Sequence, residues 1–472
     1  MLFNSYIFIF GFLPMVLLGY YLIPKRRAQL TFLLLASLGF YSYWSAKLVF
    51  FLIFTVVVDF YVARGIFNSQ TLQRKRFLLL LSVVVNLSIL FFFKYYNLFA
   101  ESFNAISGFI HGAPVSTLPI LAIVLPIGIS FYTFQSMSYV IDVYRGTSDA
   151  HADLLSFAGY VTLFPHQISG PLVRHNQIVP QLESPQTYFF NSENFWRGIC
   201  FFVCGLSKKV LLADFLSAVV IPVVDNLALA SNTEALLAMI GYTMQLYFDF
   251  SGYSDMAVGL GLMMNINFPQ NFNSPYKSFS ITEFWQRWHM TLSSWLRDYL
   301  YISLGGNRLG KLKTYRNLFL TMMIGGLWHG GSWTYAIWGV FHGLLLAIER
   351  FAKDQNLPRI QNKYVKFAVT FLLINMGWIF FRAPSFSIAI LWIQKVTLLN
   401  SHLSWDLRFV PERYKSRFFV ALAVAAGLVF FSKNTWQVKF KPNFWTSAVL
   451  ALLFVLCLMF MSEDSPFLYF QF

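Results

Sequence analysis

Long apolar runs follow one another along almost the whole chain, separated only by short polar segments. A helix needs about 20 mostly apolar residues to cross the roughly 30 Å hydrocarbon layer of a bilayer. Several runs are interrupted, as at Pro126 and Gly128, and such breaks are tolerated where they face protein or a cavity. We therefore predict an all-α, polytopic transmembrane protein with about ten to thirteen crossings. The runs lie near 5–23, 28–44, 48–63, 76–95, 117–140, 154–169, 195–224, 236–264, 314–333, 335–352, 366–382, 417–432 and 444–461.

Composition and charge support a membrane protein and argue against a soluble one. Of the 472 residues, 57% are hydrophobic and 12% are charged, whereas soluble domains are about one quarter charged. The net charge is +15, but the basic residues fall in short loops between apolar runs, which is typical of cytoplasmic loops. We therefore expect contact with the lipid bilayer and no binding to nucleic acid. The three cysteines lack a metal-ligand spacing, so neither a metal site nor a disulfide is predicted.

The basic loops also predict an orientation. Clusters at 25–27 and 74–76 follow the first and third runs, and both should be cytoplasmic, which places the N-terminus outside. The stretch 96–117 holds no lysine or arginine, so we predict an outside loop there. We expect a single integral-membrane domain over residues 1–472, with its tail at 462–472 outside.

The segment from Ser280 to Arg308 has the pattern of an amphipathic helix that does not span the membrane. Ser280 and Glu283 have the spacing of a capping box. Apolar residues then recur at intervals of three and four and form one stripe. Such a helix lies at the interface or lines a protein cavity, and a lipid-surface helix without chemistry fits the pattern as well. The stripe residues are Trp285, Trp288, Leu292, Trp295, Leu296 and Tyr299.

The sequence GGLWHGGSW at 325–333 places His329 inside an apolar run. An ionisable residue at membrane depth is costly and is functional by default; the alternative is a neutral imidazole hydrogen-bonded to a neighbouring helix. The flanking glycines would let a narrow substrate approach, and Trp328 and Trp333 could wall the site. If the helix is unbroken, His342 lies about 220° further round its axis, so one of the two rings would be only packed or supporting.

Two further groups of polar residues are candidates for binding. Arg308, Lys311 and Lys313 could hold the phosphates of a nucleotide-like donor, although an ordinary cytoplasmic loop is the favoured alternative. Asp249 and Asp255 are carboxylates inside an apolar run. They could orient a base or bind a cation, or they could hydrogen-bond to backbone or serine groups.

Several segments together form a pattern that extends over nearly the whole chain. They are LPIGISFYTFQSMSYVIDVYRG (125–146), FPHQISGPLVRHNQI (164–178), YFDFSGYSDMAVGLG (247–261), WQRWHMTLS (285–293), GGLWHGGSW (325–333), VFHG (340–343) and FLYFQF (467–472). This pattern resembles the bacterial branch of the membrane-bound O-acyltransferase (MBOAT) family, which includes the membrane subunits of alginate and peptidoglycan O-acetylation. One departure is Gly331, where many relatives have alanine.

The resemblance implies a funnel-shaped ring of transmembrane helices, with interfacial or re-entrant helices, around a central tunnel. It implies an O-acetyltransferase of the bacterial inner membrane that takes acetyl groups from cytoplasmic acetyl-CoA, a substrate and not a bound cofactor. The family's central histidine corresponds to His329 and its second histidine to His289. Transfer from a thioester needs a base and donors for the oxyanion, which imidazole and tryptophan N–H groups can supply. The residues expected to support the two histidines are His342, Trp328, Trp333 and Asp255.

The resemblance also implies a role for the periplasmic chain end. In relatives, a tyrosine in a short C-terminal motif is able to carry the acyl group, and Tyr469 matches it. The alternative is that Phe467, Tyr469 and Phe472 only anchor the tail at the interface. The implied partner is a periplasmic protein of the SGNH-hydrolase type that passes acetyl to an exported polysaccharide. We expect an alginate-type acceptor, with peptidoglycan as the alternative. A transporter or channel and a non-catalytic scaffold are the rival functions.

Overall fold

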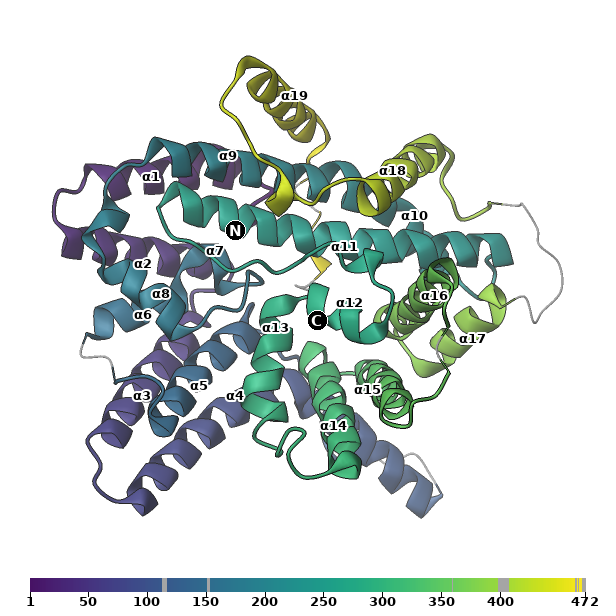
Figure 1. Cartoon of the computed structure of the whole chain (residues 1–472), viewed down its shortest axis with the longest axis horizontal. Helices are drawn as coiled ribbons and strands as arrows, with labels where there is room; N and C mark the ends of the chain where they lie inside the picture. Colours follow the sequence, from purple (N-terminus) through teal and green to yellow (C-terminus); the bar gives the residue numbers. More distant parts are fainter. Residues whose placement is uncertain are drawn as a thin grey trace. The chain divides into compact units, whose positions relative to one another are not determined.

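The computed structural model describes residues 1–112, 117–150, 153–358, 360–397, 407–462, 465, 467 and 468. Within these residues the regular secondary structure is helical (Figure 1), which confirms the predicted all-α class. The chain packs as two compact units. Unit 1 comprises Met1–Ile199 and Ala257–Pro269, and unit 2 comprises Cys200–Met256 and Gln270–Phe472.

Unit 1 is built from the N-terminal helices. Helices α3, α4 and α5 pack against one another, and α2 packs on α6. Two helices, α9 and α11, continue from one unit into the other along the sequence. The bounds are η1 (Ile7–Phe12), α1 (Leu13–Leu22), α2 (Arg26–Ser42), α3 (Val49–Phe67), α4 (Leu72–His111), α5 (Ile129–Arg145), α6 (Leu154–Thr162), α7 (Phe164–Gln167), α8 (His175–Glu183), η2 (Pro185–Tyr188), α9 (Ser192–Ser207) and α11 (Asn232–Met263).

One buried carboxylate ties three helices of unit 1 together. Asp59 on α3 accepts hydrogen bonds from Ser82 Oγ (2.6 Å) and Asn86 Nδ2 (2.9 Å) on α4. It also accepts one from Ser136 Oγ (2.5 Å) on α5. A buried charge is costly unless hydrogen bonds satisfy it, so these contacts help to set the register of the three helices.

Unit 2 contains the remaining helices and most of the residues singled out above. Within it α14 packs along α15, and α15 packs on α16 (Figure 1). The bounds are η3 (Lys208–Ala213), α10 (Asp214–Asp225), η4 (Pro275–Lys277), α12 (Ile281–Arg287), α13 (Met290–Trp295), η5 (Leu296–Tyr301), α14 (Lys311–His329), α15 (Trp333–Asp354), α16 (Lys363–Arg382), α17 (Phe386–Val396), α18 (Glu412–Phe431), η6 (Thr435–Gln437) and α19 (Phe444–Phe460).

Among the described residues, four helices are long and apolar enough to cross a membrane by length and composition: α3, α4, α16 and α18. Helix α4 has 40 residues, so at 1.5 Å per residue it is about 60 Å long, roughly twice the hydrocarbon thickness. The chain is therefore a membrane protein. The predicted number of crossings stays a prediction.

The prediction of a loop over 96–117 is wrong for most of its length, whereas the predicted location outside the membrane stays a prediction. Helix α4 continues through this stretch and ends only at Gly112, which adopts the left-handed conformation (φ 67°). Its polar residues hold the chain that returns along the helix: Asn97 Nδ2 donates to Leu121 O (2.8 Å), and Asn104 makes bonds of the same kind. The stretch without lysine or arginine is therefore mostly helical, and Asn97 and Asn104, seven residues apart, lie on one side of the helix.

Helices α14 and α15 pack with their backbones in near contact. A Cβ added at Gly326 would lie 2.4 Å from Tyr335 O and 2.8 Å from Gly339 Cα. One added at Gly339 would lie 2.4 Å from Met322 O, and one at Gly330 would meet the Tyr335 ring. The space beside these glycines is filled by protein, so close helix packing explains them without a substrate.

Gly339→Ala should therefore lower the thermal stability of the protein. Overpacking of this kind costs about 1–3 kcal/mol, and melting of the detergent-solubilised protein measures it. Gly427→Ala on α18 is the matched control, because a Cβ there meets nothing within 4 Å and alanine favours a helix over glycine. Equal melting temperatures for Gly339→Ala and the wild type would contradict the packing argument.

Candidate active site

His289 lies where the expected amphipathic helix is interrupted. Ser280 Oγ accepts from Glu283 N (3.0 Å), which confirms the predicted helix start, and all six stripe residues are buried. The prediction of one continuous helix is wrong, because α12 ends at Arg287 and α13 begins at Met290. Between them His289 has φ 43° and ψ 53°, a left-handed conformation that is uncommon outside glycine. His289 therefore lies between the two helices and belongs to neither of them.

The side chain of Asn271 determines how His289 is oriented. Asn271 Oδ1 accepts from Thr291 N (3.4 Å) and Thr291 Oγ1 (2.9 Å), and its Nδ2 donates to Ser254 Oγ (3.1 Å). The oxygen of this amide is thereby identified, and it lies 3.1 Å from His289 Nδ1. An amide oxygen can only accept, so the Nδ1 atom of neutral His289 carries the proton. Its Nε2 atom then offers a lone pair, as a base or a hydrogen-bond acceptor requires.

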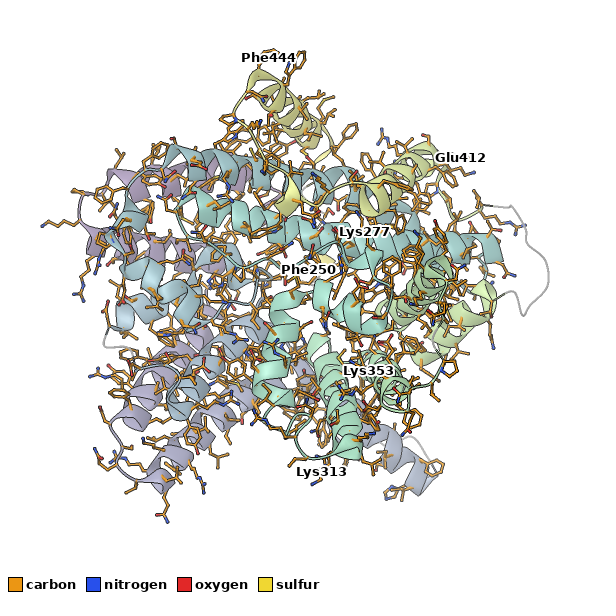
Figure 2. The ribbon with its side chains drawn as sticks, in the orientation of Figure 1. Phe250, Lys277, Lys313, Lys353, Glu412 and Phe444 are labelled. Carbon is orange, nitrogen blue, oxygen red and sulfur yellow. The ribbon has the colours of Figure 1, made fainter. Side chains whose placement is uncertain are left out.

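Aromatic rings from other helices pack around His289. The His289 ring is fully buried, and its centroid lies 4.7 Å from that of Phe250, with the rings at 85°. Phe250 is on α11 and is labelled in Figure 2. The Trp328 ring lies on another side, at 6.4 Å. Helices from distant parts of the sequence thus meet at this imidazole.

His329 ends α14 and joins the same cluster of rings. It is 5% exposed, and its ring packs against those of Trp328 (4.9 Å), Trp338 (5.0 Å) and Phe381 (5.3 Å). Trp328 therefore contacts both His289 and His329. The structure brings together the two histidines and one tryptophan that the sequence singled out.

His342 packs beside this cluster instead of on an opposite helix face. The helix is broken after His329, because α15 begins only at Trp333, so the estimated 220° separation does not apply. Trp338 contacts His329 and also His342, at 5.2 Å. His342 is fully buried, and its Nδ1 accepts from Trp285 Nε1 (3.4 Å). This bond joins His342 on α15 to Trp285 on α12.

Trp333, Asp255 and Tyr469 are the remaining residues that the sequence predicted to support the histidines or to carry the acetyl group. Trp333 is 57% exposed. Asp255 is buried and binds Lys208 Nζ (2.5 Å) and Thr435 Oγ1 (2.6 Å), so its charge is satisfied without either histidine. Tyr469 lies outside the described residues.

The basic residues proposed for donor binding lie at the surface of unit 2. Arg308, Lys311 and Lys313 are all exposed, and Lys311 Nζ donates to Asp354 O (3.4 Å) at the end of α15. Lys313 and Lys353 are labelled in Figure 2. A cavity of about 690 Å³ lies between α12, α14 and α15 and is lined by other residues, among them Thr282, Glu283, Glu349, Arg350, Lys353 and Lys366.

Sequence reasoning missed Asn271 and two buried lysines. Lys208 and Lys209 pair with Asp255 and Asp249, on α11. A signal was present, because charged side chains within apolar runs pair with one another, and the run 195–224 holds both lysines. No comparable signal marked Asn271, whose neighbours in space are far away in the sequence.

The sequence matches a known family model and several known proteins. The family model described as the membrane-bound O-acyltransferase family matches residues 148–386, which include both histidines of the cluster. The chain is 47% identical to the probable alginate O-acetylase AlgI of Pseudomonas aeruginosa, over 82% of this chain and 73% of that protein. It is 42% identical to the protein of the same name from Pseudomonas putida, over 100% of both chains.

A further relative is the peptidoglycan O-acetyltransferase of Helicobacter pylori, which is 35% identical over 100% of this chain and 98% of that protein. Identity at this level over whole chains requires a shared fold, and the matched segments carry the cluster of His289, Trp328 and His329 described above. The resemblance noted in the sequence is confirmed. The chain belongs to the membrane-bound O-acyltransferase family, and it is an acyltransferase.

Proposed function

We propose that this protein moves acetyl groups from cytoplasmic acetyl-CoA across the bacterial inner membrane for O-acetylation of an exported polysaccharide. The observation that carries the proposal is the pair His289 and His329, joined through Trp328 in a buried aromatic cluster. The names of the alginate O-acetylase relatives favour an alginate-type acceptor. The full-length match to a peptidoglycan O-acetyltransferase supports peptidoglycan as the second candidate.

His329 would act as the base. It takes the proton of the acceptor hydroxyl as the oxygen attacks the thioester carbonyl. A C–O bond forms, the C–S bond breaks, and coenzyme A leaves as a thiol after receiving that proton from the imidazolium. His289 Nε2, an acceptor in its fixed tautomer, orients the hydroxyl. With the proton on Nδ1, neutral His289 has no N–H at Nε2 to donate to the oxyanion.

Trp338 is the better donor to the oxyanion. Its indole ring packs against His329 at 5.0 Å and is 1% exposed. Among the described residues, its Nε1 has no hydrogen-bond partner. A buried donor without a partner is costly in a stable fold, and a developing oxyanion would supply one.

The cavity at the ends of α14 and α15 supports a donor site. Its basic lining residues Arg350, Lys353 and Lys366 suit the phosphates of coenzyme A, and its 690 Å³ volume is typical of ligand pockets. Arg308, Lys311 and Lys313 would extend this basic surface. Placing the donor here assigns this end of unit 2 to the cytoplasm, in keeping with the positive-inside bias.

On the far side, Tyr469 would accept the acetyl group as a phenolic ester. A periplasmic partner of the SGNH type would then take it to the polysaccharide. Membership of an acyltransferase family argues against the transporter or channel function. A non-catalytic scaffold would leave polymer acetylation intact when His329 is removed.

His329→Ala and His289→Ala should each lower transfer of labelled acetyl from acetyl-CoA by about 10²–10⁴-fold, because the first removes the base and the second removes the acceptor that orients the hydroxyl. Transfer in purified membranes measures this. His111→Ala, at an exposed helix end in unit 1, is the control and should keep full activity. Full transfer in His329→Ala would contradict the enzyme mechanism.

Trp338→Phe should lower kcat by about 10²-fold with little change in KM, because it removes one oxyanion donor while keeping an aromatic ring. Steady-state kinetics with acetyl-CoA separates the two constants. Trp445→Phe, at an exposed position on α19, is the matched control. A raised KM with normal kcat would assign Trp338 to substrate binding instead.

Mass spectrometry of the C-terminal peptide should find an acetyl group on Tyr469 after incubation with acetyl-CoA. Tyr469→Phe removes the acceptor oxygen, so it should abolish both this label and polymer acetylation. A Tyr469→Phe protein that acetylates the polymer at the full rate would show that the acetyl group does not pass through Tyr469.

A further inference from the structure

The last described residues of the chain fold back into unit 2. Phe467 is 1% exposed and Leu468 is 7% exposed. Chain ends are poorly ordered unless specific contacts hold them. Burial of Phe467 in protein also differs from the simple expectation that this ring anchors the tail at a lipid interface.

The tail meets a buried group of three charged residues. Lys209 Nζ lies 2.8 Å from Asp249 Oδ1 and 2.9 Å from Asp214 Oδ1. The Lys209 and Asp249 side chains are each 3% exposed, and that of Asp214 is 17% exposed. One cation between two carboxylates leaves a formal excess of negative charge, so the two carboxylates require further donors.

The tail supplies those donors. Leu468 N donates to Asp249 Oδ2 (3.0 Å), and Ser465 Oγ donates to Asp214 Oδ1 (2.6 Å). The Phe467 ring lies over Lys209 Nζ at 4.8 Å, a cation–π geometry. Each described tail residue from 465 to 468 thus meets a different member of the charged group.

Helix α11 connects this tail contact to the candidate active site. Asp249 binds Leu468, and Tyr253, one turn later, packs edge-on against Phe467 at 4.7 Å. The neighbouring positions serve His289: Phe250 packs on its ring, and Ser254 holds Asn271. Two adjacent faces of the same two turns therefore carry the tail and the histidine.

We propose that Lys209, Asp214, Asp249 and Tyr253 form a dock for the C-terminal tail that positions Tyr469 for acyl transfer. The role of Tyr469 in this statement rests on the proposed function. The dock residues are positioning residues: they hold Phe467 and Leu468, the residues just before Tyr469, against the helix that also orients His289. Docking would thereby present the acceptor hydroxyl to the histidines, with no diffusing acceptor needed.

The dock can be tested without catalysis by trimming the full-length protein with carboxypeptidase Y in detergent and following the intact mass. In the wild type, trimming should stop close to Leu468. Asp249→Leu removes the acceptor for the tail backbone, and Phe467→Ala removes the ring while leaving the charged group intact. Each should speed removal of residues 465–468 by about tenfold or more, because proteolysis follows the population of the released state.

Asp255→Leu is the matched control. Asp255 lies on α11, as Asp249 does, but it pairs with Lys208 and not with the tail. Trimming should therefore stay at the wild-type level. Wild-type trimming in both Asp249→Leu and Phe467→Ala would overturn the dock. Equally fast trimming in Asp255→Leu would also overturn it, because the effect would then reflect a general loss of stability.

A second measurement in the same variants tests positioning. The acetyl label on Tyr469 should fall about tenfold in Phe467→Ala, while KM for acetyl-CoA stays unchanged. An unchanged label with a released tail would overturn the positioning role. If the wild type carries no label although trimming follows the expected pattern, the relay through Tyr469 fails and the dock stands.

Discussion

The geometry of the candidate active site depends on the hydrogen bonds of Asn271. Its side chain meets His289, Thr291 and Ser254, and its backbone carbonyl accepts from Met290 N (2.9 Å). One residue therefore connects α11, the histidine and the start of α13. The left-handed backbone of His289 costs about 1–3 kcal/mol, and these bonds hold it in place. The imidazole is oriented before any substrate arrives, which is what electrostatic preorganisation requires.

Helix α11 organises the buried charged residues, as Asn271 organises the candidate active site. An apolar environment makes every buried ionic group dependent on its partners, and this helix carries two carboxylates that each find a lysine from the preceding helical segment, Lys208 and Lys209. Lys208 pairs with Asp255, and Lys209 pairs with Asp249. Asp255 also accepts a hydrogen bond from Thr435, which precedes α19, and Asp249 accepts one from Leu468 in the C-terminal tail. Satisfying the charges also fixes where those distant segments lie.

Local patterns in the sequence predicted the class of fold and much of the site. The cap at Ser280 and the buried stripe follow from neighbours three and four residues apart, so periodicity was sufficient. The break at His289 was not predictable in this way, because Asn271 causes it from outside the helix. Helix α4 was cut short in the prediction because the absence of lysine and arginine does not distinguish a loop from a helix whose asparagines bind a neighbouring segment. The two histidines came from motifs, whereas Trp338 became a candidate only through its buried N–H group.

The backbone contact between Gly326 and Gly339 limits how acetyl groups could cross the membrane in the proposed mechanism. Many membrane proteins expose a site to each side in turn by sliding or rocking one group of helices past another. Here α14 carries His329 at its end, and an axial shift would drive the carbonyls of α15 into side chains that are larger than glycine. His329 therefore stays fixed on a rigid helix pair. In the proposed mechanism the acetyl group would reach a stationary base from one side and leave on Tyr469 at the other, so passage across the bilayer would need no alternation of the protein.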